Sequence, residues 1–373
     1  MTTALETTDV AIIGGGIMGS AIALRLAQCG VGVTVIERGI PGAEASSAAA
    51  GILGPQMEAE GPGPLFDLGL MSRALYPSLA DELRVATGID VGHTRSGVLA
   101  VAVDDEGEAE LAARFAWQVA HGLRVLRLDG PAVRELEPAL SPGVRAALAF
   151  PDDGQVNARE LARAFSQAAA MAGARFLTGR YVRRVVIEDG VATGVELDGE
   201  RLPAGAVVVA AGSWSGLVDG AGVPADVVRP ARGQLVSIET RPPLFRHVVS
   251  MHKRGYLVPR RDGTVLAGST LEMVGFRKQV TVGGLAAILT MARTLIPALA
   301  DAEVTGSWSN FRPFTEDHLP VLGATNVRGL VLATGHYRNG ILLAPITAEA
   351  IAELVATGRS AIDLAPFSVG RFV

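Results

Sequence analysis

A glycine-rich turn that directly follows a short apolar run constrains the fold of this chain more than any other feature. Gly14, Gly16 and Gly19 form the pattern G-x-G-x-x-G after the apolar residues 10–13, and Glu37 ends a second apolar run eighteen residues later. The first glycine permits a tight turn from strand to helix, the second lets a pyrophosphate approach the backbone, and the third allows close helix packing. The helix N-terminus stabilises the phosphates, and the Glu37 carboxylate can accept both ribose hydroxyls. The sequence therefore predicts a dinucleotide site near the N-terminus.

Length and composition limit the classes of protein to which the chain can belong. Its 373 residues suit two domains, and a hydrophobic content of 49% supplies material for more than one core. The net charge of −5, with acidic and basic residues interspersed, argues against a nucleic-acid partner. No apolar run of membrane-spanning length and no basic leader stand out, so we expect a cytoplasmic protein without a membrane partner.

Cysteine and histidine usage gives little support for a metal or thiol site. The six histidines are scattered without metal-ligand spacing, so we expect no metal. Cys29 is the single cysteine and lies in the helical pattern of residues 17–29, which predicts a buried structural thiol.

Two styles of secondary structure alternate along the chain. Helices are expected at 65–87, 106–121, 157–171, 283–299 and 342–356, and a loop at 55–64. Strands are expected at 31–36, 98–103, 124–128, 206–210, 304–312 and 330–334, with a further strand that starts at 176–177 and a strand-turn-strand pattern at 180–197. Residues 233–269 instead form short alternating segments that are typical of an antiparallel sheet. We therefore predict an α/β fold with a doubly wound, Rossmann-like nucleotide domain, discontinuous in sequence, and a substrate domain with an antiparallel sheet. The expected boundaries are 1–90, 151–230 and 318–373 for the nucleotide domain and 91–150 and 231–317 for the substrate domain.

Three further segments carry a family resemblance that covers nearly the whole chain. Residues 44–53 read E-A-S-S-A-A-A-G-I-L, residues 207–216 end a strand in A-G-S-W-S-G, and residues 335–345 read G-H-Y-R-N-G-I-L-L-A-P. Together with the glycine turn, these segments resemble the D-amino-acid oxidase family of flavoproteins, and most closely its glycine oxidase branch. The resemblance implies FAD rather than NAD as the cofactor. It also implies that the last helix points its N-terminus at the flavin N1 and C2 carbonyl, where negative charge develops on reduction.

The resemblance assigns cofactor contacts residue by residue. The positions implied to contact FAD are Gly14, Gly16, Ile17, Met18, Gly19, Glu37, Arg38, Ser46, Ser47, Ala49, Ala50, Gly51, Val182, Ala211, Gly212, Trp214, Gly335, His336, Arg338, Asn339, Gly340, Ile341 and Leu342.

The resemblance also implies the groups that hold a substrate. Arg312 matches the arginine that grips a substrate carboxylate, and Tyr256 matches a tyrosine that donates to the same group. A planar guanidinium can bind a carboxylate through two parallel hydrogen bonds, which fixes the neighbouring carbon as well. Arg338 either adds positive charge near the flavin or only holds its loop. Ile52 and Leu271 stand where some members of the family carry methionine, so they are expected to line the substrate pocket and to adjust its volume.

The implied activity is oxidation of a small amino acid or an N-substituted glycine. Hydride transfer from the α-carbon to flavin N5 would give an imine, which hydrolyses to an oxo acid plus ammonia or an amine, while O₂ is reduced to H₂O₂. A flavin dehydrogenase that uses a quinone or another acceptor, and a natural-product enzyme that cleaves N-carboxymethyl amino acids, would carry the same motifs. A protein that keeps the nucleotide only as a structural element would leave Arg312 and Tyr256 unexplained. The protein is expected to be a homo-oligomer, and the resemblance implies a tetramer. It also implies a role either in thiamine synthesis or in a natural-product pathway.

Overall fold

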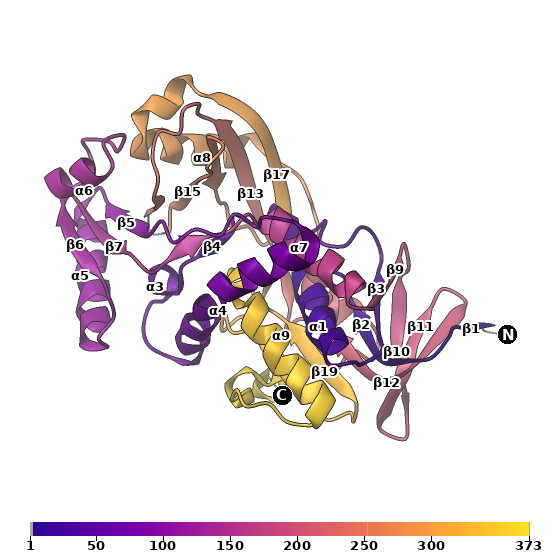
Figure 1. Ribbon diagram of the computed structural model, residues 1–373. Helices are drawn as coiled ribbons and strands as arrows, with labels where there is room; N and C mark the ends of the chain where they lie inside the picture. Colours follow the sequence, from indigo (N-terminus) through magenta and orange to yellow (C-terminus); the bar gives the residue numbers. More distant parts are fainter. Residues whose placement is uncertain (1–2, 252, 373) are drawn as a thin grey trace.

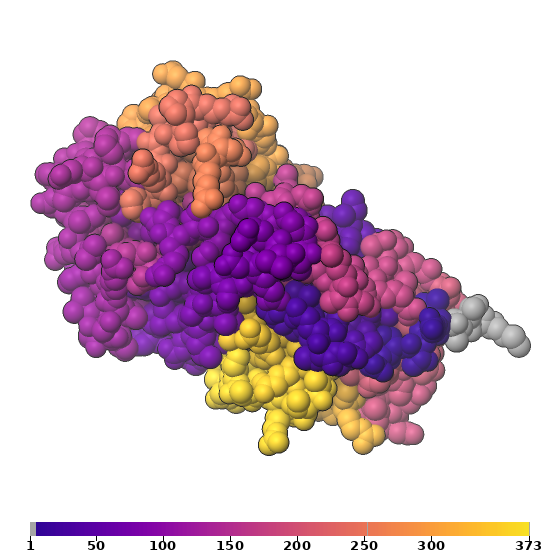
Figure 2. Space-filling view, viewed as in Figure 1, coloured from indigo at the N-terminus to yellow at the C-terminus, as the bar shows by residue number. Residues whose placement is uncertain are grey.

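The computed structural model describes residues 3–251 and 253–372, and these residues form two large β-sheets with helices around them (Figure 1). The space-filling view places the orange segment and the yellow C-terminal segment at opposite ends of the face shown (Figure 2). This arrangement confirms the predicted α/β fold class.

The first sheet is built on five parallel strands. Their order is β19 (Leu330–Thr334), β12 (Glu200–Val209), β2 (Thr8–Ile13), β3 (Val33–Glu37) and β9 (Arg175–Thr178). The strands β10 (Val182–Glu188) and β11 (Val191–Leu197) extend it as an antiparallel meander, and β18 (Val321–Ala324) and β1 (Thr3–Ala4) pair at its margins. Because the five parallel strands share one direction, their carboxyl ends meet at one edge, which is where ligands of such sheets bind.

Alternate residues of the parallel strands supply two separate cores. Val10 and Ile12 pack with helices on one face, whereas Ala11 and Ile13 pack on the other face against the meander. The helices of the first face are α1 (Ile17–Gln28), α4 (Pro64–Thr87), α7 (Ala158–Met171) and α9 (Gly340–Thr357). Because both faces of these parallel strands are buried, they contain runs of consecutive apolar residues instead of alternating between apolar and polar residues.

The second sheet has eight strands and is mostly antiparallel. Its order is β17 (Glu303–Phe314), β13 (Arg229–Glu239), β16 (Thr264–Gly268), β15 (Gly255–Pro259), β14 (Val248–Met251), β5 (Val98–Ala102), β7 (Ala146–Phe150) and β6 (Leu126–Asp129). The pair of β14 and β5 is parallel, so the sheet is mixed. The helix α8 (Val282–Leu295) packs on one face, and α5 (Asp105–Ala120) contributes to the core on the other.

The remaining elements are short. These are α2 (Ala45–Ala48), β4 (Ile52–Leu53), α3 (Pro55–Glu58), α6 (Gly130–Leu136), β8 (Gly154–Gln155) and the 3₁₀ segments Gly212–Leu217, Pro297–Asp301, Ala365–Phe367 and Val369–Phe372. The strands of the first sheet lie within residues 3–13, 33–37, 175–209 and 321–334, and those of the second within 98–150 and 229–314. We propose the domain division 1–90, 151–230 and 318–373 against 91–150 and 231–317, which this sheet membership supports.

Several local predictions need correction. The predicted loop 55–64 begins with α3, and the predicted helix 283–299 ends at Leu295, because Pro297 has no N–H to continue it. The strand β7 and the helix α6 were not predicted. Cys29 is exposed rather than buried, because it is the C-cap of α1 and lies beyond the buried face of that helix.

The helix α9 is long and apolar enough to cross a membrane by length and composition, which the sequence analysis did not expect. Most of the helix is buried, and its side chains pack with α1 and α4 in the core of the first sheet. Its hydrophobicity is therefore that of a core helix.

Truncation of a buried side chain on α7 provides a test of this packing. Phe165 is 1% exposed and belongs to the helix core, whereas Met171 on the same helix is 65% exposed. We expect Phe165→Ala to reduce the free energy of unfolding by about 3–5 kcal/mol through lost burial and a cavity. Met171→Ala should change it by less than about 0.5 kcal/mol. Urea unfolding followed by circular dichroism measures both, and equal effects would contradict the packing.

Candidate active site

A single continuous cavity extends from the carboxyl edge of the first sheet to the second sheet. The ends of four parallel strands open onto it at Gly14, Glu37, Ala210 and Thr334. Arg312 and Tyr256 of the second sheet line its other end. The dinucleotide turn and the predicted substrate residues therefore share one cavity.

The glycine turn after β2 has the geometry expected for close backbone approach. Gly14 has φ of +102°, and a Cβ there would lie 2.6 Å from the carbonyl oxygen of Ala210. A Cβ at Gly19 would lie 1.9 Å from the carbonyl oxygen of Gly14, so this glycine lets α1 pack on the turn. Gly14, Gly16, Ile17 and Met18 line the cavity.

Glu37 is oriented at the end of β3 by two backbone amides. The N–H of Gly15 donates to Glu37 Oε2 and the N–H of Gly39 donates to Oε1, each at 2.8 Å. The carboxylate lines the cavity beside the glycine turn. Its position fits the recognition of ribose hydroxyls next to a pyrophosphate.

The segment 45–51, which comprises α2 and the loop 49–51, is held in place by α1 and by residues of the second sheet. Ser46 Oγ accepts a hydrogen bond from the N–H of Ile17 at 2.9 Å, which attaches the segment to the first turn of α1. From the second sheet, Trp308 Nε1 donates to the carbonyl of Ala48 at 3.0 Å and Arg260 Nη2 donates to that of Ala50 at 2.6 Å. The loop that the resemblance assigns to the flavin is therefore a fixed wall of the cavity.

Arg260 is a residue that the sequence analysis missed. Its Nη1 also donates to Gln155 Oε1 at 2.7 Å and to the carbonyl of Val156 at 2.8 Å, so the guanidinium joins three neutral acceptors. Burial lowers the pKa of Arg260 to about 10, which leaves the side chain charged at neutral pH. The local sequence offers no signal for this role, because the carbonyl of Ala50 is 210 positions away.

Aromatic and charged contacts cover the nucleotide end of the cavity. The Arg38 guanidinium lies 3.9 Å above the centre of the Trp214 ring, and Phe276 stacks on that ring at a centroid distance of 5.2 Å. Lys278 Nζ contacts Glu44 Oε2 at 2.6 Å. Burial alone would raise the pKa of Glu44, but its hydrogen bond and ion pair with Lys278 outweigh this and lower it.

Arg312 belongs to β17, and its side chain lies beside the neighbouring strand β13 at the substrate end of the cavity. Its Nη1 donates to the carbonyl of Thr270 at 3.2 Å and its Nη2 donates to Ser269 Oγ at 2.5 Å. A Cβ at Gly233 would lie 2.1 Å from Arg312 Nη1, so the absence of a side chain there makes room for the guanidinium. Tyr256 is on β15 and, like Arg312, lines the cavity. Gly233 was not recognised from the sequence.

The segment 335–341 closes the cavity from the side of α9. Tyr76 donates its hydroxyl to the carbonyl of Ile341, and Ser72 Oγ donates to that of Leu342 at 2.6 Å, so α4 fixes the start of α9. Burial lowers the pKa of His336 to about 3, and the imidazole is therefore neutral. Its Nε2 contacts Thr347 Oγ1 at 3.1 Å.

Arg338 is the cation of this segment that faces the cavity. Its Nη1 lies 3.7 Å from Glu58 Oε2, and its side chain remains 46% exposed. Burial lowers the pKa of Arg338, but the Glu58 and Tyr337 side chains outweigh this, and the pKa is raised. The guanidinium therefore stays positive beside the N-terminus of α9.

The structure brings most of the sequence-predicted residues to this cavity. The expected positions that line it are Gly14, Gly16, Ile17, Met18, Glu37, Arg38, Ser46, Ala49, Ala50, Gly51, Ile52, Val182, Ala211, Gly212, Trp214, Tyr256, Arg312, His336, Arg338, Asn339, Gly340 and Ile341. Gly335 precedes the lining residues of α9 with φ of +73°.

Five expected positions do not line the cavity, and Gly335 is one of them. Gly19 packs the first helix on its turn, Ser47 points its hydroxyl at the carbonyl of Glu44, and Leu342 is buried among the helices. Leu271 is 47% exposed, because it lies on the segment that leaves the sheet after β16. The prediction that Leu271 lines the substrate pocket therefore disagrees with this geometry, whereas Ile52 lines the cavity.

The space at Gly233 generates a test of the Arg312 geometry. We expect Gly233→Ala to displace the guanidinium, because overpacking of this kind costs about 1–3 kcal/mol. Binding of acetate, measured by calorimetry as a minimal carboxylate, should weaken by about tenfold. Gly306→Ala is the matched control on β17, because a Cβ there meets no heavy atom within 4 Å. Unchanged acetate binding in Gly233→Ala would show that Arg312 does not hold carboxylates.

Comparison with known proteins agrees with this geometry. The chain is 40% identical to a glycine oxidase of Geobacillus kaustophilus over 98% of this chain and 97% of that protein, and its fold matches the crystal structure of glycine oxidase from that organism with a TM-score of 0.94, covering 99% and 100% of the two chains at 39% identity. The structure of iminodiacetate oxidase from Chelativorans sp. BNC1 matches with a TM-score of 0.85 at 28% identity, covering 96% of this chain and 98% of that one. A bifunctional protein ThiO/ThiG of Synechocystis sp. is 38% identical over 98% of this chain and 54% of its own length. The family model described as FAD dependent oxidoreductase matches residues 9–354. The chain therefore belongs to the DAO family of FAD-dependent oxidoreductases.

Proposed function

We propose that the protein oxidises glycine or a small N-substituted glycine with FAD as the cofactor. The observation that carries this proposal is that the Arg312 guanidinium and the dinucleotide turn open onto the same cavity. Among the residues that the structure describes, no ion pair includes Arg312. The guanidinium is therefore free to bind a carboxylate supplied by the substrate.

The residues present fit FAD. Gly14 and Gly16 leave space for a pyrophosphate at the start of α1, and Glu37 is held by backbone amides for the ribose hydroxyls. The cavity continues past the fixed loop 48–51 to the N-terminus of α9, as an elongated dinucleotide requires. FAD supplies the acceptor for the two electrons that leave the substrate.

The chain's own side chains orient the substrate. Arg312 and Tyr256 would hold the carboxylate, which fixes the α-carbon at the cavity wall formed by loop 48–51. Arg338 and the N-terminus of α9 add positive charge to the same cavity. His336 is neutral and bonded to Thr347, so we assign it no proton transfer and expect the substrate amine to bind in its neutral form.

The reaction removes a hydride from the α-carbon and produces an imine. Hydrolysis of the imine gives an oxo acid plus ammonia or, from an N-substituted substrate, a primary amine, and we propose O₂ as the final acceptor, which yields H₂O₂. The names of the relatives support small glycine-type substrates, since iminodiacetate is itself an N-carboxymethyl glycine. The similarity to a bifunctional protein ThiO/ThiG supports the further proposal that this reaction serves thiamine synthesis.

A substrate panel tests the reaction. Glycine, sarcosine, D-alanine and iminodiacetate are mixed anaerobically with the yellow holoenzyme, and bleaching of the flavin absorbance is followed before oxygen is admitted and peroxide is measured. Bleaching by at least one compound is expected. Failure of all four would overturn the proposed reaction, and bleaching without rapid reoxidation in air would favour another electron acceptor.

Substitution of the carboxylate clamp tests the role of Arg312. Arg312→Ala should lower kcat/KM for the best substrate by about 10²- to 10³-fold, because a charged hydrogen-bonded pair is lost at the reacting centre. Arg159→Ala, at an exposed position of α7, is the control and should change kcat/KM by less than about twofold. A near-native Arg312→Ala enzyme would remove this residue from the site.

The pH dependence of flavin reduction tests the assignment of His336. Because the pKa of His336 is about 3, the imidazole does not titrate between pH 5 and pH 10. We expect the reduction rate to rise with pH as the substrate amine loses its proton, with a midpoint that depends on the substrate. The His336→Gln variant should show the same midpoint, and a midpoint that moves with this substitution would make His336 part of the titration.

A further inference from the structure

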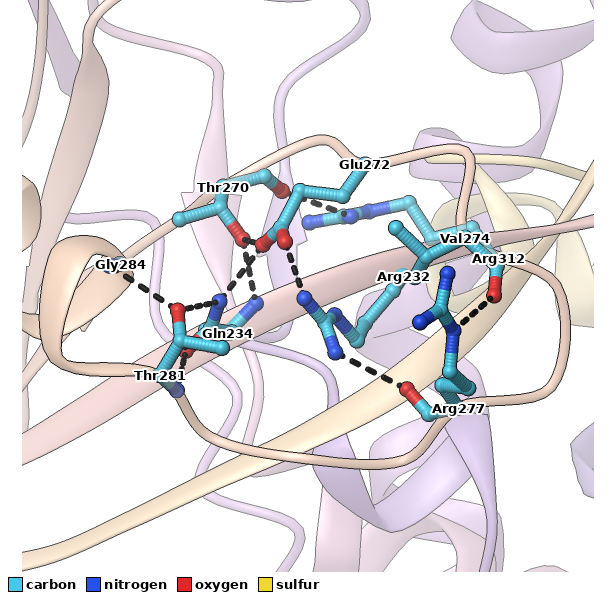
Figure 3. Close-up of polar contacts among 9 residues, drawn as sticks. All are labelled: Arg232, Gln234, Thr270, Glu272, Val274, Arg277, Thr281, Gly284 and Arg312. Carbon is cyan, nitrogen blue, oxygen red and sulfur yellow. Dashed lines mark hydrogen bonds and ion pairs between the residues drawn. The ribbon is translucent and has the colours of Figure 1, made fainter.

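A polar cluster next to Arg312 does not line the cavity and has no direct part in the proposed reaction. It consists of Arg232 and Gln234 on β13 and of Thr270, Glu272 and Thr281 on the segment that leads from β16 to α8, hereafter the Glu272 cluster (Figure 3). Figure 3 shows the Glu272 carboxylate between Gln234 and Arg232, while Arg312 contacts the backbone of Thr270. The cluster therefore contacts Arg312, the residue proposed to bind the substrate carboxylate, through the carbonyl of Thr270.

Glu272 is the centre of the cluster. Its Oε1 accepts hydrogen bonds from Thr270 Oγ1 and from Gln234 Nε2, each at 2.6 Å, and its Oε2 forms an ion pair with Arg232. Burial alone would raise the pKa of Glu272, but the hydrogen bonds from Thr270, Arg232 and Gln234 outweigh this and lower it. The carboxylate is therefore ionised, and donors surround both of its oxygens.

Thr270 connects this carboxylate to Arg312. The carbonyl of Thr270 accepts from Arg312 Nη1 at 3.2 Å, and the neighbouring Ser269 Oγ accepts from Arg312 Nη2 at 2.5 Å. The hydroxyl of Thr270 donates to Glu272 and accepts from the N–H of Gln234 at 3.0 Å. The position of the Thr270 carbonyl, and with it the direction of the guanidinium, therefore depends on the hydroxyl of the same residue.

The segment is attached at both ends to β13. Backbone hydrogen bonds join Arg232 and Glu272 in both directions at 2.9 and 3.0 Å. At the far end, Gln234 Oε1 accepts from the N–H of Thr281 at 2.7 Å. Because β13 pairs with β17, which carries Arg312, these bonds fix the position of the segment relative to Arg312.

The charges of the cluster also keep Arg312 available. Glu272 lies two positions after Thr270, and a free carboxylate so close to Arg312 would compete with a substrate carboxylate. Arg232 pairs with Glu272 and is itself only 4% exposed, whereas the Glu272 side chain is 27% exposed, so the pair is shielded from water on the side of the arginine. Arg232 Nη1 donates in addition to the carbonyl of Arg277 at 3.0 Å, which fixes its direction away from the clamp.

We propose that Thr270 and Glu272 are positioning residues that set the orientation of Arg312 and so determine the affinity for the substrate carboxylate. This inference rests on the proposed function, in which Arg312 binds that carboxylate. Neither residue touches the substrate, and both act through the guanidinium.

A pair of substitutions at position 270 tests the inference. Thr270→Val removes the hydroxyl at nearly constant volume, whereas Thr270→Ser retains it. In the FAD-loaded enzyme, we expect the acetate Kd, measured by perturbation of the flavin spectrum, to rise about five- to twentyfold in Thr270→Val and to stay within about twofold in Thr270→Ser. Thr305→Val, which removes a hydroxyl bonded to Ser237 on the same sheet, is the control and should leave the Kd unchanged.

A double-substitution cycle shows whether the effect passes through Arg312. A lysine at position 312 cannot contact both the Thr270 carbonyl and Ser269 with a fixed planar group. The effect of Thr270→Val on the acetate Kd should therefore shrink to less than about twofold in the Arg312→Lys background. An equal effect in both backgrounds, or a lower melting temperature with an unchanged Kd, would overturn the positioning role.

The outcomes separate this inference from the proposed function. If the native enzyme binds acetate with the expected dependence on position 270 but no amine bleaches the flavin, the positioning role stands and the proposed reaction fails. If amines bleach the flavin but Thr270→Val and Thr270→Ser bind acetate alike, the reaction stands and the positioning role fails. Failure of the native enzyme to bind acetate and to react with amines would overturn both.

Discussion

The attachment of loop 48–51 to the second sheet is the interaction on which the rest of the site depends. The two sheets have separate cores, so their relative position at the cavity is determined by contacts such as those of Trp308 and Arg260 with the carbonyls of Ala48 and Ala50. Because these bonds link one wall of the cavity to the sheet that carries Arg312 and Tyr256, they fix the distance between that wall and these two side chains.

Glycine residues leave space at both ends of the cavity. Gly14 opens the nucleotide end, and Gly233 opens the space that Arg312 occupies. In the long antiparallel pair of β13 and β17, Arg312 is opposite Ala231 and Gly233 is opposite Asn310, so Gly233 is a diagonal neighbour of Arg312. Ser269 and the carbonyl of Thr270, which belongs to the Glu272 cluster, accept hydrogen bonds from the guanidinium, so its orientation is preorganised.

The nucleotide half of the site was largely predictable from the sequence, because its signals are local. Each signal lies within a short stretch of sequence, namely the turn at 14–19, the strand that ends at Glu37 and the segment 335–341. Most of these residues line one cavity in the structure. Gly233, Arg260 and Thr270 were not recognisable, because each acts on a residue distant in sequence and no spacing rule connects the partners. Leu271 shows the reverse error, since a position inferred from resemblance lies on an exposed segment.

The contacts over the nucleotide end differ in strength from those at the substrate end. Lys278 and Glu44 are 44% and 38% exposed, so their ion pair contributes little and weakens with salt. The stack of Phe276 on Trp214 is also partly open to water, because Phe276 is itself 40% exposed. Displacement of this cover would therefore break only partly exposed contacts, and the hydrogen bonds of Arg312 to Thr270 and Ser269 lie at the other end of the cavity.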